Sequence, residues 1–157
     1  MELRPAEEAD RPLLRAVYGS TREEELEPTG WTRAQKNAFL DHQFGAQDSY
    51  YKEHYEGATY DVIVVDGRPA GRLYVARWDD EIRIMDIALL PEFRGKGVGG
   101  RLLESLLREG ADAGLPVSIH VESSNPALSL YRRLGFVEIE ERVPYVLMRW
   151  SPGAGGL

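Results

Sequence analysis

A short glycine-rich segment constrains the fold of this chain more than any other feature. It reads Gly95-Lys96-Gly97-Val98-Gly99-Gly100. Residues 81–90, before it, are apolar and β-branched as in a central strand, whereas leucines recur at helical spacing from Leu102 to Leu107 after it. Glycines at such a turn let backbone N–H groups approach an anion, and a helix N-terminus carries about half a positive charge. The segment predicts a strand, a phosphate-binding turn and a helix that ends at Gly114.

Other phosphate-binding patterns fit this segment less well. The Walker A pattern requires Ser or Thr after its lysine, but Gly97 follows Lys96. The dinucleotide fingerprint Gly-x-Gly-x-x-Gly is matched literally by Gly95, Gly97 and Gly100, and Glu122 follows about 20 residues later. That fingerprint normally follows the first strand of a parallel sheet directly, whereas residues 91–94 intervene here. A purely structural glycine turn remains a further alternative.

The middle of the chain indicates consecutive strands. Residues 60–65 and 70–78 have strand character, and Asp66-Gly67 between them is a strong signal for a tight hairpin. Together with residues 81–90 they predict an antiparallel meander. Further strands are expected at residues 1–4, 117–121, 136–142 and 146–150. The mixture of strands and helices predicts an α/β fold.

Three helices are expected besides the one after the glycines. Apolar spacing predicts the first over residues 10–18, and Thr32 can cap the second, which ends or kinks near Gly45. Asn125-Pro126 predicts the start of the third, over residues 128–134.

The connecting and terminal segments complete the expected organisation. Glu23-Glu24-Glu25 and Pro28-Thr29-Gly30 indicate a solvated loop between the first two helices. Residues 1–150 are expected to form one domain, and residues 151–157 a disordered tail.

Composition restricts the partners and the compartment. Nineteen Lys and Arg residues against 26 Asp and Glu residues give a net charge of −7, which disfavours nucleic acid as a ligand. The absence of cysteine excludes disulfides and a cysteine nucleophile, and His42 and His54 lack a third residue at metal-ligand spacing, so no metal site is expected. No export signal or membrane-spanning run is apparent. We expect a cytoplasmic protein that does not bind membranes, either a monomer or a homodimer.

Two segments together resemble the signatures of the GNAT (Gcn5-related) N-acetyltransferase superfamily. Arg94-Gly95-Lys96-Gly97-Val98-Gly99 is similar to its Arg/Gln-x-x-Gly-x-Gly/Ala acyl-CoA loop, and residues 125–136, Asn-Pro-Ala-Leu-Ser-Leu-Tyr-Arg-Arg-Leu-Gly-Phe, resemble its second signature. The upstream segment 86–93 is similar to that superfamily's strand and turn. The resemblance implies an acyl-CoA N-acyltransferase fold: a mostly antiparallel central sheet with one splayed parallel strand pair, flanked by helices.

The resemblance also implies acetyl-CoA as the acyl donor. Backbone groups of the splayed strand would pair with pantetheine and polarise the thioester carbonyl, while the glycine-turn amides would hold the diphosphate. The cofactor-binding residues implied are Ile87, Ala88, Leu89, Arg94, Gly95, Lys96, Gly97, Val98, Gly99, Gly100 and Asn125. Asn125 and Tyr131 are six residues apart, where many members have seven, so the residues themselves favour helix capping as the role of Asn125.

Acyl transfer to an amine needs an acid for the leaving thiolate and a base for the amine. The resemblance implies Tyr131 as the acid, since a phenol with a pKa near 10 is protonated at neutral pH; a tyrosine of the core is the alternative. Many members place a glutamate on one of the splayed strands, but Arg83 stands at the corresponding place here. His120 on the next strand is therefore the expected base, with Glu122 on the same strand face as the alternative, acting through water.

The sequence leaves the acceptor open: a small amine, an amino acid, an antibiotic or a protein N-terminus all fit. Direct acetylation of a primary amine is the expected activity. A CoA-binding regulatory module without turnover is the alternative, and a dinucleotide-binding oxidoreductase is a more distant one.

Overall fold

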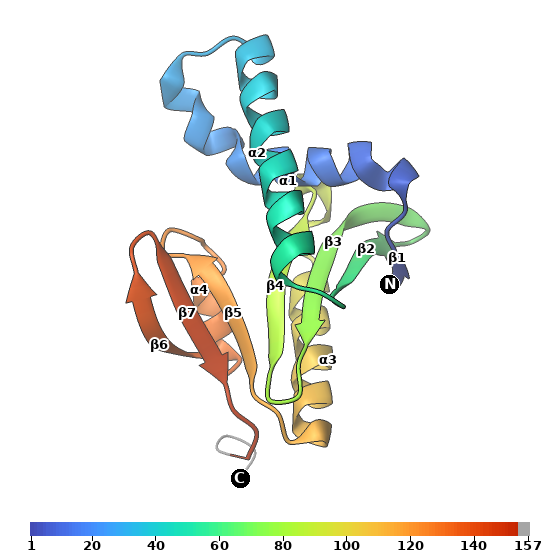
Figure 1. Cartoon of the computed structure of the whole chain (residues 1–157), viewed down its shortest axis with the longest axis vertical. Helices are drawn as coiled ribbons and strands as arrows, with labels where there is room; N and C mark the ends of the chain where they lie inside the picture. Colours follow the sequence, from blue (N-terminus) through green and yellow to red (C-terminus); the bar gives the residue numbers. More distant parts are fainter. Residues whose placement is uncertain (154–157) are drawn as a thin grey trace. The chain divides into compact units, whose positions relative to one another are not determined.

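The computed structural model of the chain describes residues 1–153 (Figure 1). Seven strands form one sheet in the hydrogen-bonded order β1-β2-β3-β4-β5-β7-β6. Of these neighbours, β4 and β5 are parallel and the others antiparallel. A mixed sheet with one parallel pair and flanking helices confirms the expected fold class.

The elements keep the order expected from the sequence. The strands are β1 (Glu2–Pro5), β2 (Thr59–Val65), β3 (Arg68–Arg77), β4 (Ile82–Leu89), β5 (Val117–Glu122), β6 (Val137–Arg142) and β7 (Tyr145–Trp150). The helices are α1 (Arg11–Leu26), α2 (Arg33–His54), α3 (Val98–Ala113) and α4 (Leu128–Arg133). Short 3-10 turns cover Glu8–Asp10, Glu27–Thr29 and Pro91–Phe93.

Residue contacts divide the chain into two compact units. The first unit holds residues 1–73 and 87–94, and the second holds residues 74–86 and the chain from Gly95 onward. That residues 1–150 act as one domain remains a prediction. The tail expected at residues 151–157 falls mostly on residues 154–157, which lie outside the described residues.

The first unit has its apolar core between α1, α2 and β2. Its buried side chains are Leu14, Tyr18, Leu26, Leu40, Phe44 and Val62. The loop predicted at Glu23-Glu24-Glu25 is wrong, because α1 continues to Leu26, whose burial extends the apolar face of the helix. The expected end of the helix near Gly45 is also wrong: α2 continues to His54, since the packing of Leu40 and Phe44 offsets the roughly 1 kcal/mol that a helical glycine costs. A kink at Gly45 stays a prediction.

Local signals at turns and caps are confirmed. Thr32 caps α2: its hydroxyl accepts from Gln35 N at 3.2 Å, and the Gln35 side chain accepts from Thr32 N at 2.9 Å. Asp66 and Gly67 have φ values of 50° and 76°, as a two-residue hairpin turn between β2 and β3 requires.

Gly71 in β3 allows a close backbone approach that the sequence does not reveal. A Cβ atom built on Gly71 would lie 2.1 Å from the carbonyl oxygen of Ala88 and 3.0 Å from the Cα of Leu89. Only a residue without a side chain fits there, because both neighbours belong to the backbone.

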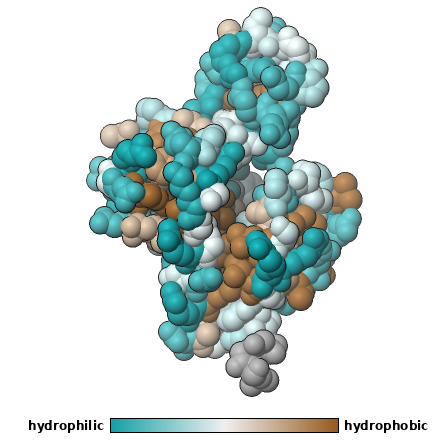
Figure 2. Space-filling model, turned by 180° about the vertical axis from the view of Figure 1, so that it is seen from behind, coloured by the Kyte–Doolittle hydropathy of each residue, from teal (hydrophilic) through white to brown (hydrophobic). Residues whose placement is uncertain are grey.

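The second unit packs α3 against β5. In the same unit β7 pairs with β5 on one side and β6 on the other (Figure 1). A β-bulge lies between Glu138 and Glu140, so that Glu140 rather than Ile139 opposes Leu147 of β7. Figure 2 shows apolar patches among polar ones on one face of the molecule. The exposed apolar residues include Val137 and Ile139 of β6 and Val143 directly after it.

We predict that Gly110→Ala lowers the free energy of unfolding. A Cβ atom there would lie 2.8 Å from Leu115 O and 2.9 Å from Val117 Cγ2. Such overpacking costs about 1–3 kcal/mol, more than the roughly 0.5–1 kcal/mol that alanine gains over glycine in a helix. Gly99→Ala in the same helix is the control, because nothing lies within 4 Å of its Cβ position. Denaturant unfolding that leaves Gly110→Ala as stable as the control contradicts this packing.

Candidate functional site

The glycine turn has the backbone conformation that its residues suggest. After the 3-10 turn Pro91–Phe93, Gly95 and Gly97 adopt φ values of 73° and 80°. These values lie in the left-handed region that side chains other than glycine rarely adopt. Gly97 is the N-cap of α3, which begins at Val98.

The first turn of α3 presents bare backbone amides. The first N–H of the helix ladder is that of Arg101, which donates to Gly97 O at 3.1 Å. The N–H groups of residues 98–100 precede it and have no carbonyl of their own helix to bond. Cβ atoms built at Gly95, Gly97, Gly99 and Gly100 would meet nothing within 4 Å. This open surface of N–H groups at a helix N-terminus fits an anion such as a diphosphate.

Arg94 immediately precedes the glycine turn, but its guanidinium bonds to residues outside that turn. Nε donates to the carbonyl of Leu89 at 2.9 Å, and a terminal nitrogen donates to the hydroxyl of Ser20 at 3.1 Å. Two of the implied cofactor-binding residues, Arg94 and Leu89, thus bond to each other, and Arg94 ties the end of β4 to the start of the turn. The sequence did not indicate Ser20, which is 74 residues away.

The parallel strands β4 and β5 pair with each other only near their beginnings, and both strands extend beyond this pairing. Residues Ile82–Ile84 of β4 pair with Val117–Ile119 of β5, while β4 runs on to Leu89 and β5 to Glu122. Ile87, Ala88 and Leu89 lie in this continuation of β4, and His120 and Glu122 in that of β5.

Tyr131 is buried in the second unit. Its side chain is 4% exposed, and its ring packs edge-on against Phe136 with the centroids 5.9 Å apart. Burial raises the pKa of the Tyr131 phenol above its usual value of 10, and the negative charge of Asp86 raises it further. The phenol is therefore protonated at neutral pH, as a proton donor must be.

Asn125 bonds to the start of α4. Its side-chain oxygen accepts from Ala127 N at 2.8 Å, and its carbonyl accepts from Leu128 N at 3.2 Å. This Asx turn immediately precedes the short helix that carries Tyr131. The predicted N-cap role of Asn125, with Pro126 at the first helical position, is wrong, because α4 begins at Leu128 with Ala127 as its N-cap and no side-chain cap hydrogen bond.

His120 lies on the exposed side of β5. Partial burial of its ring lowers the pKa of His120 below the usual 6.5, and the positive charge of Arg83 lowers it further. Glu122, two residues later, lies on the same face of β5. The two candidate bases thus share one sheet face.

A polar row crosses the sheet next to His120. Arg83 pairs in register with Ser118, and Ser118 pairs in turn with Arg149 of β7. Arg83 Nε donates to the Ser118 hydroxyl at 2.7 Å, and Glu81 accepts hydrogen bonds from both of these side chains. The sequence indicated the place of Arg83 but not its partners, because Ser118 is 35 residues away.

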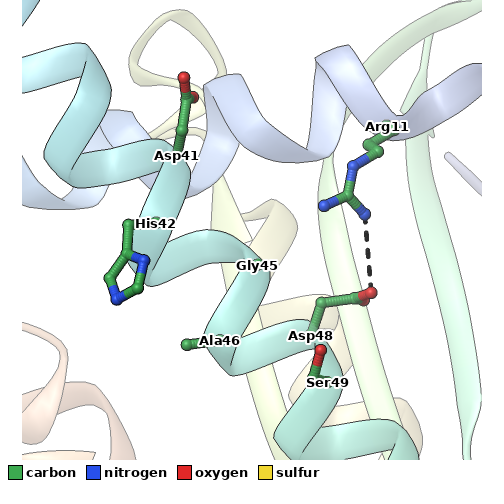
Figure 3. A pocket seen from close by; sticks show the side chains of 7 residues that line it. All are labelled: Arg11, Asp41, His42, Gly45, Ala46, Asp48 and Ser49. Carbon is green, nitrogen blue, oxygen red and sulfur yellow. Dashed lines mark ion pairs between the residues drawn. The ribbon is translucent and has the colours of Figure 1, made fainter.

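A separate hollow of about 530 Å³ lies in the first unit, along α2 (Figure 3). It is lined by Arg11, Asp41, His42, Gly45, Ala46, Asp48 and Ser49. Arg11 and Asp48 form an ion pair across it at 3.6 Å. None of the predicted catalytic or cofactor-binding residues lines this hollow.

Two features are absent from the described residues. Over residues 1–153, no group of three or more His, Asp or Glu side chains is arranged to hold a metal ion. Within the same range, no helix combines the length and the apolar character needed to cross a membrane.

Two proteins similar in sequence to this chain are named as acetyltransferases. A Bacillus subtilis protein named "Putative ribosomal protein bS18-alanine N-acetyltransferase" is 38% identical over 96 residues, covering 57% of this chain and 62% of that protein. The mycothiol acetyltransferase of Nocardiopsis dassonvillei is 36% identical over 96 residues, covering 60% of this chain and 24% of that protein. The chain thus spans less than two thirds of the length of these relatives.

A solved structure and a family model extend the similarity. The PaiA N-acetyltransferase of Thermoplasma acidophilum, solved in complex with coenzyme A, matches with a TM-score of 0.71 at 14% identity, covering 96% of this chain and 98% of that one. This likeness shows the fold. The model of the acetyltransferase (GNAT) family matches residues 20–136, which include the glycine turn and the Tyr131 helix. The chain belongs to the GNAT acetyltransferase family.

Proposed function

We propose that this protein is an N-acetyltransferase that transfers the acetyl group of acetyl-CoA to a primary amine by direct attack. The observation that carries the proposal is the first turn of α3, where glycines leave backbone amides open at a helix N-terminus. Membership of the GNAT family supports acyl-CoA as the anionic ligand of that turn.

Most of the proposed contacts with acetyl-CoA are made by backbone groups. The N–H groups between Gly95 and Gly100 hold the diphosphate, and the α3 dipole adds to their attraction. Lys96 contributes positive charge, whereas the contacts of Arg94 with Leu89 and Ser20 support a role in holding the turn. Backbone groups of residues 87–89 pair with pantetheine.

The proposed chemistry uses two side chains of the second unit. The amine nitrogen attacks the thioester carbonyl carbon, forming the C–N bond, and the C–S bond breaks with its electron pair on sulfur. His120 accepts the proton from the amine, and Tyr131 donates its proton to the thiolate. The lowered pKa of His120 and the raised pKa of Tyr131 support these roles, because each group then has the required protonation state at neutral pH. Glu122 is the alternative base, through water.

The free energy needed to deprotonate the attacking amine differs between classes of acceptor. A lysine side chain with a pKa near 10.4 costs roughly 4–5 kcal/mol to deprotonate at pH 7, whereas an α-amine with a pKa near 8 costs far less. The relatives include proteins named for a ribosomal protein's alanine and for mycothiol. A polypeptide α-amine and the amine of a small molecule are therefore the two acceptors to test first.

A CoA-binding regulatory module is the second candidate. The absence of a glutamate at the place of Arg83 favours it, because many relatives use a carboxylate there. CoA binding without thioester consumption across both acceptor classes distinguishes this module from the enzyme.

We predict that Gly100→Glu abolishes binding of acetyl-CoA in a folded protein. Its Cβ meets open space, so the substitution is tolerated, but its carboxylate repels a diphosphate at the same amides. Gly97 is a poorer choice, because its φ of 80° strains any side chain. Gly100→Ala is the matched control and retains binding. Calorimetry that finds equal acetyl-CoA affinity in Gly100→Glu and Gly100→Ala contradicts the assignment of this turn.

We predict that Tyr131→Phe lowers kcat by about 100-fold or more while leaving the KM for acetyl-CoA nearly unchanged. Phenylalanine keeps the ring packing against Phe136 and removes only the proton donor. Tyr50→Phe, at an exposed tyrosine of α2, controls for loss of a hydroxyl elsewhere. Steady-state kinetics in which both variants match the wild type rule out Tyr131 as the acid.

We predict that His120→Gln lowers kcat/KM by about 100-fold or more near neutral pH and removes its contribution to the acid limb of the pH profile. Glu122→Gln, the same kind of change on the same strand face, has the smaller effect. If Glu122→Gln instead causes the larger loss, the base is Glu122 and the assignment of His120 is wrong.

A further inference from the structure

We propose that Arg83 is a positioning residue that keeps His120 in its unprotonated, proton-accepting form, and that Glu81 and Ser118 hold Arg83 in place for this purpose. The inference rests on the proposed role of His120 as the base. Arginine remains protonated at any pH at which the protein is folded, so Arg83 cannot itself accept the proton.

The Arg83 guanidinium is fixed from several sides. It donates to the hydroxyl of Ser118 at 2.7 Å and to the carboxylate of Glu81 at 3.0 Å, and it lies over the ring of Trp78 at 5.3 Å from the ring centroid. Ser118 is fully buried and donates in turn to Glu81. The side chains of both Arg83 and Glu81 are only 13% exposed. Such a network holds a charge at one place rather than leaving it on a mobile side chain.

The strand register places Arg83 on the same face of the sheet as His120. Arg83 and Ser118 are opposite each other in the parallel pair, and His120 is two residues beyond Ser118 on β5. Because side chains alternate along a strand, Ser118 and His120 face the same way. The guanidinium held by Ser118 is therefore on the face of the sheet that carries the imidazole.

Glu81 does not cancel the positive charge of the cluster. Arg149, in register with Ser118 on the other neighbouring strand, also lies 3.8 Å from the Glu81 carboxylate. Two guanidiniums thus share one carboxylate, which leaves the cluster with a net positive charge. A positive charge near an imidazole disfavours its protonation.

Besides Arg83, Arg142 of β6 lowers the pKa of His120, whereas Glu140 of β6 and Glu81 raise it. Glu140 and Arg142 also form an ion pair at 2.6 Å. Glu122 shares the strand face of His120 and is the alternative base. The direction set by partial burial and by Arg83 therefore prevails: the pKa of His120 is lowered.

The first test is a titration of His120 by NMR. The chain has three histidines, so the His120 signal is assigned as the one missing from His120→Gln. We expect its titration midpoint to move to higher pH in Arg83→Gln and to return toward the wild-type value in Arg83→Lys, which restores the charge. Arg77→Gln is the matched control: it removes the same charge from an ion pair with Glu109 of α3, and His120 then titrates as in the wild type.

A second variant keeps the proposal testable if the first variant does not fold. If thermal unfolding shows that Arg83→Gln does not fold, Ser118→Ala removes only the hydroxyl that holds Nε, and the midpoint is again expected to rise. An unchanged midpoint in every folded variant of Arg83 or Ser118 overturns the proposal.

The pH profile of kcat/KM separates this proposal from the proposed function. We expect the acid limb of Arg83→Gln to move to higher pH by the same amount as the His120 midpoint, with a severalfold loss on the acid side and recovery at high pH. A midpoint that moves while the acid limb stays in place overturns the positioning role. If the wild type acetylates neither acceptor class, the proposed enzyme fails, while the NMR titration still decides whether Arg83 holds His120 unprotonated.

Discussion

The open amides at the start of α3 are the constraint around which the proposed site is organised. A helix that begins without a side-chain cap leaves its first N–H groups unsatisfied, and glycine is normally a poor choice for two positions of a first turn. Here Gly99 and Gly100 place no side chain beside those groups, and nothing lies within 4 Å of their Cβ positions. The arrangement costs helix stability, and binding of an anion is the simplest physical reason to retain it.

Side chains along β5 point alternately to the two faces of the sheet, so that one face packs into the core of the second unit and the other carries the candidate bases. Val117, Ile119 and Val121 are buried, and α3 packs against this strand. Ser118, His120 and Glu122 point the other way, toward the polar row that includes Arg83. One short strand thus supplies core side chains to one face and both candidate bases to the other.

Much of the fold could be predicted because its signals are local. The Asp66-Gly67 hairpin, the Thr32 capping box and the glycine turn each depend on residues within a few positions of one another. The extension of α1 to Leu26 could not be predicted from Glu23-Glu24-Glu25, because it depends on tertiary burial of a leucine. The tight approach of Gly71 to Ala88 and the bulge before Glu140 likewise become evident only when strands pair.

The candidate site was predictable to a similar degree. Motif resemblance indicated Tyr131 and the glycine turn, and strand parity placed His120 and Glu122 on one face. The bonds of Arg83 with Ser118 and of Arg94 with Ser20 join residues 35 and 74 positions apart, so no local pattern could reveal them.

Thermal unfolding with CoA, acetyl-CoA, NAD or ATP shows whether the glycine turn is an acyl-CoA site, because a ligand that binds the folded state raises the midpoint of unfolding. We expect CoA and acetyl-CoA to raise the midpoint and NAD and ATP to leave it unchanged. A rise with NAD alone, or no rise with either CoA species at saturating concentration, contradicts the assignment of the glycine turn as an acyl-CoA site.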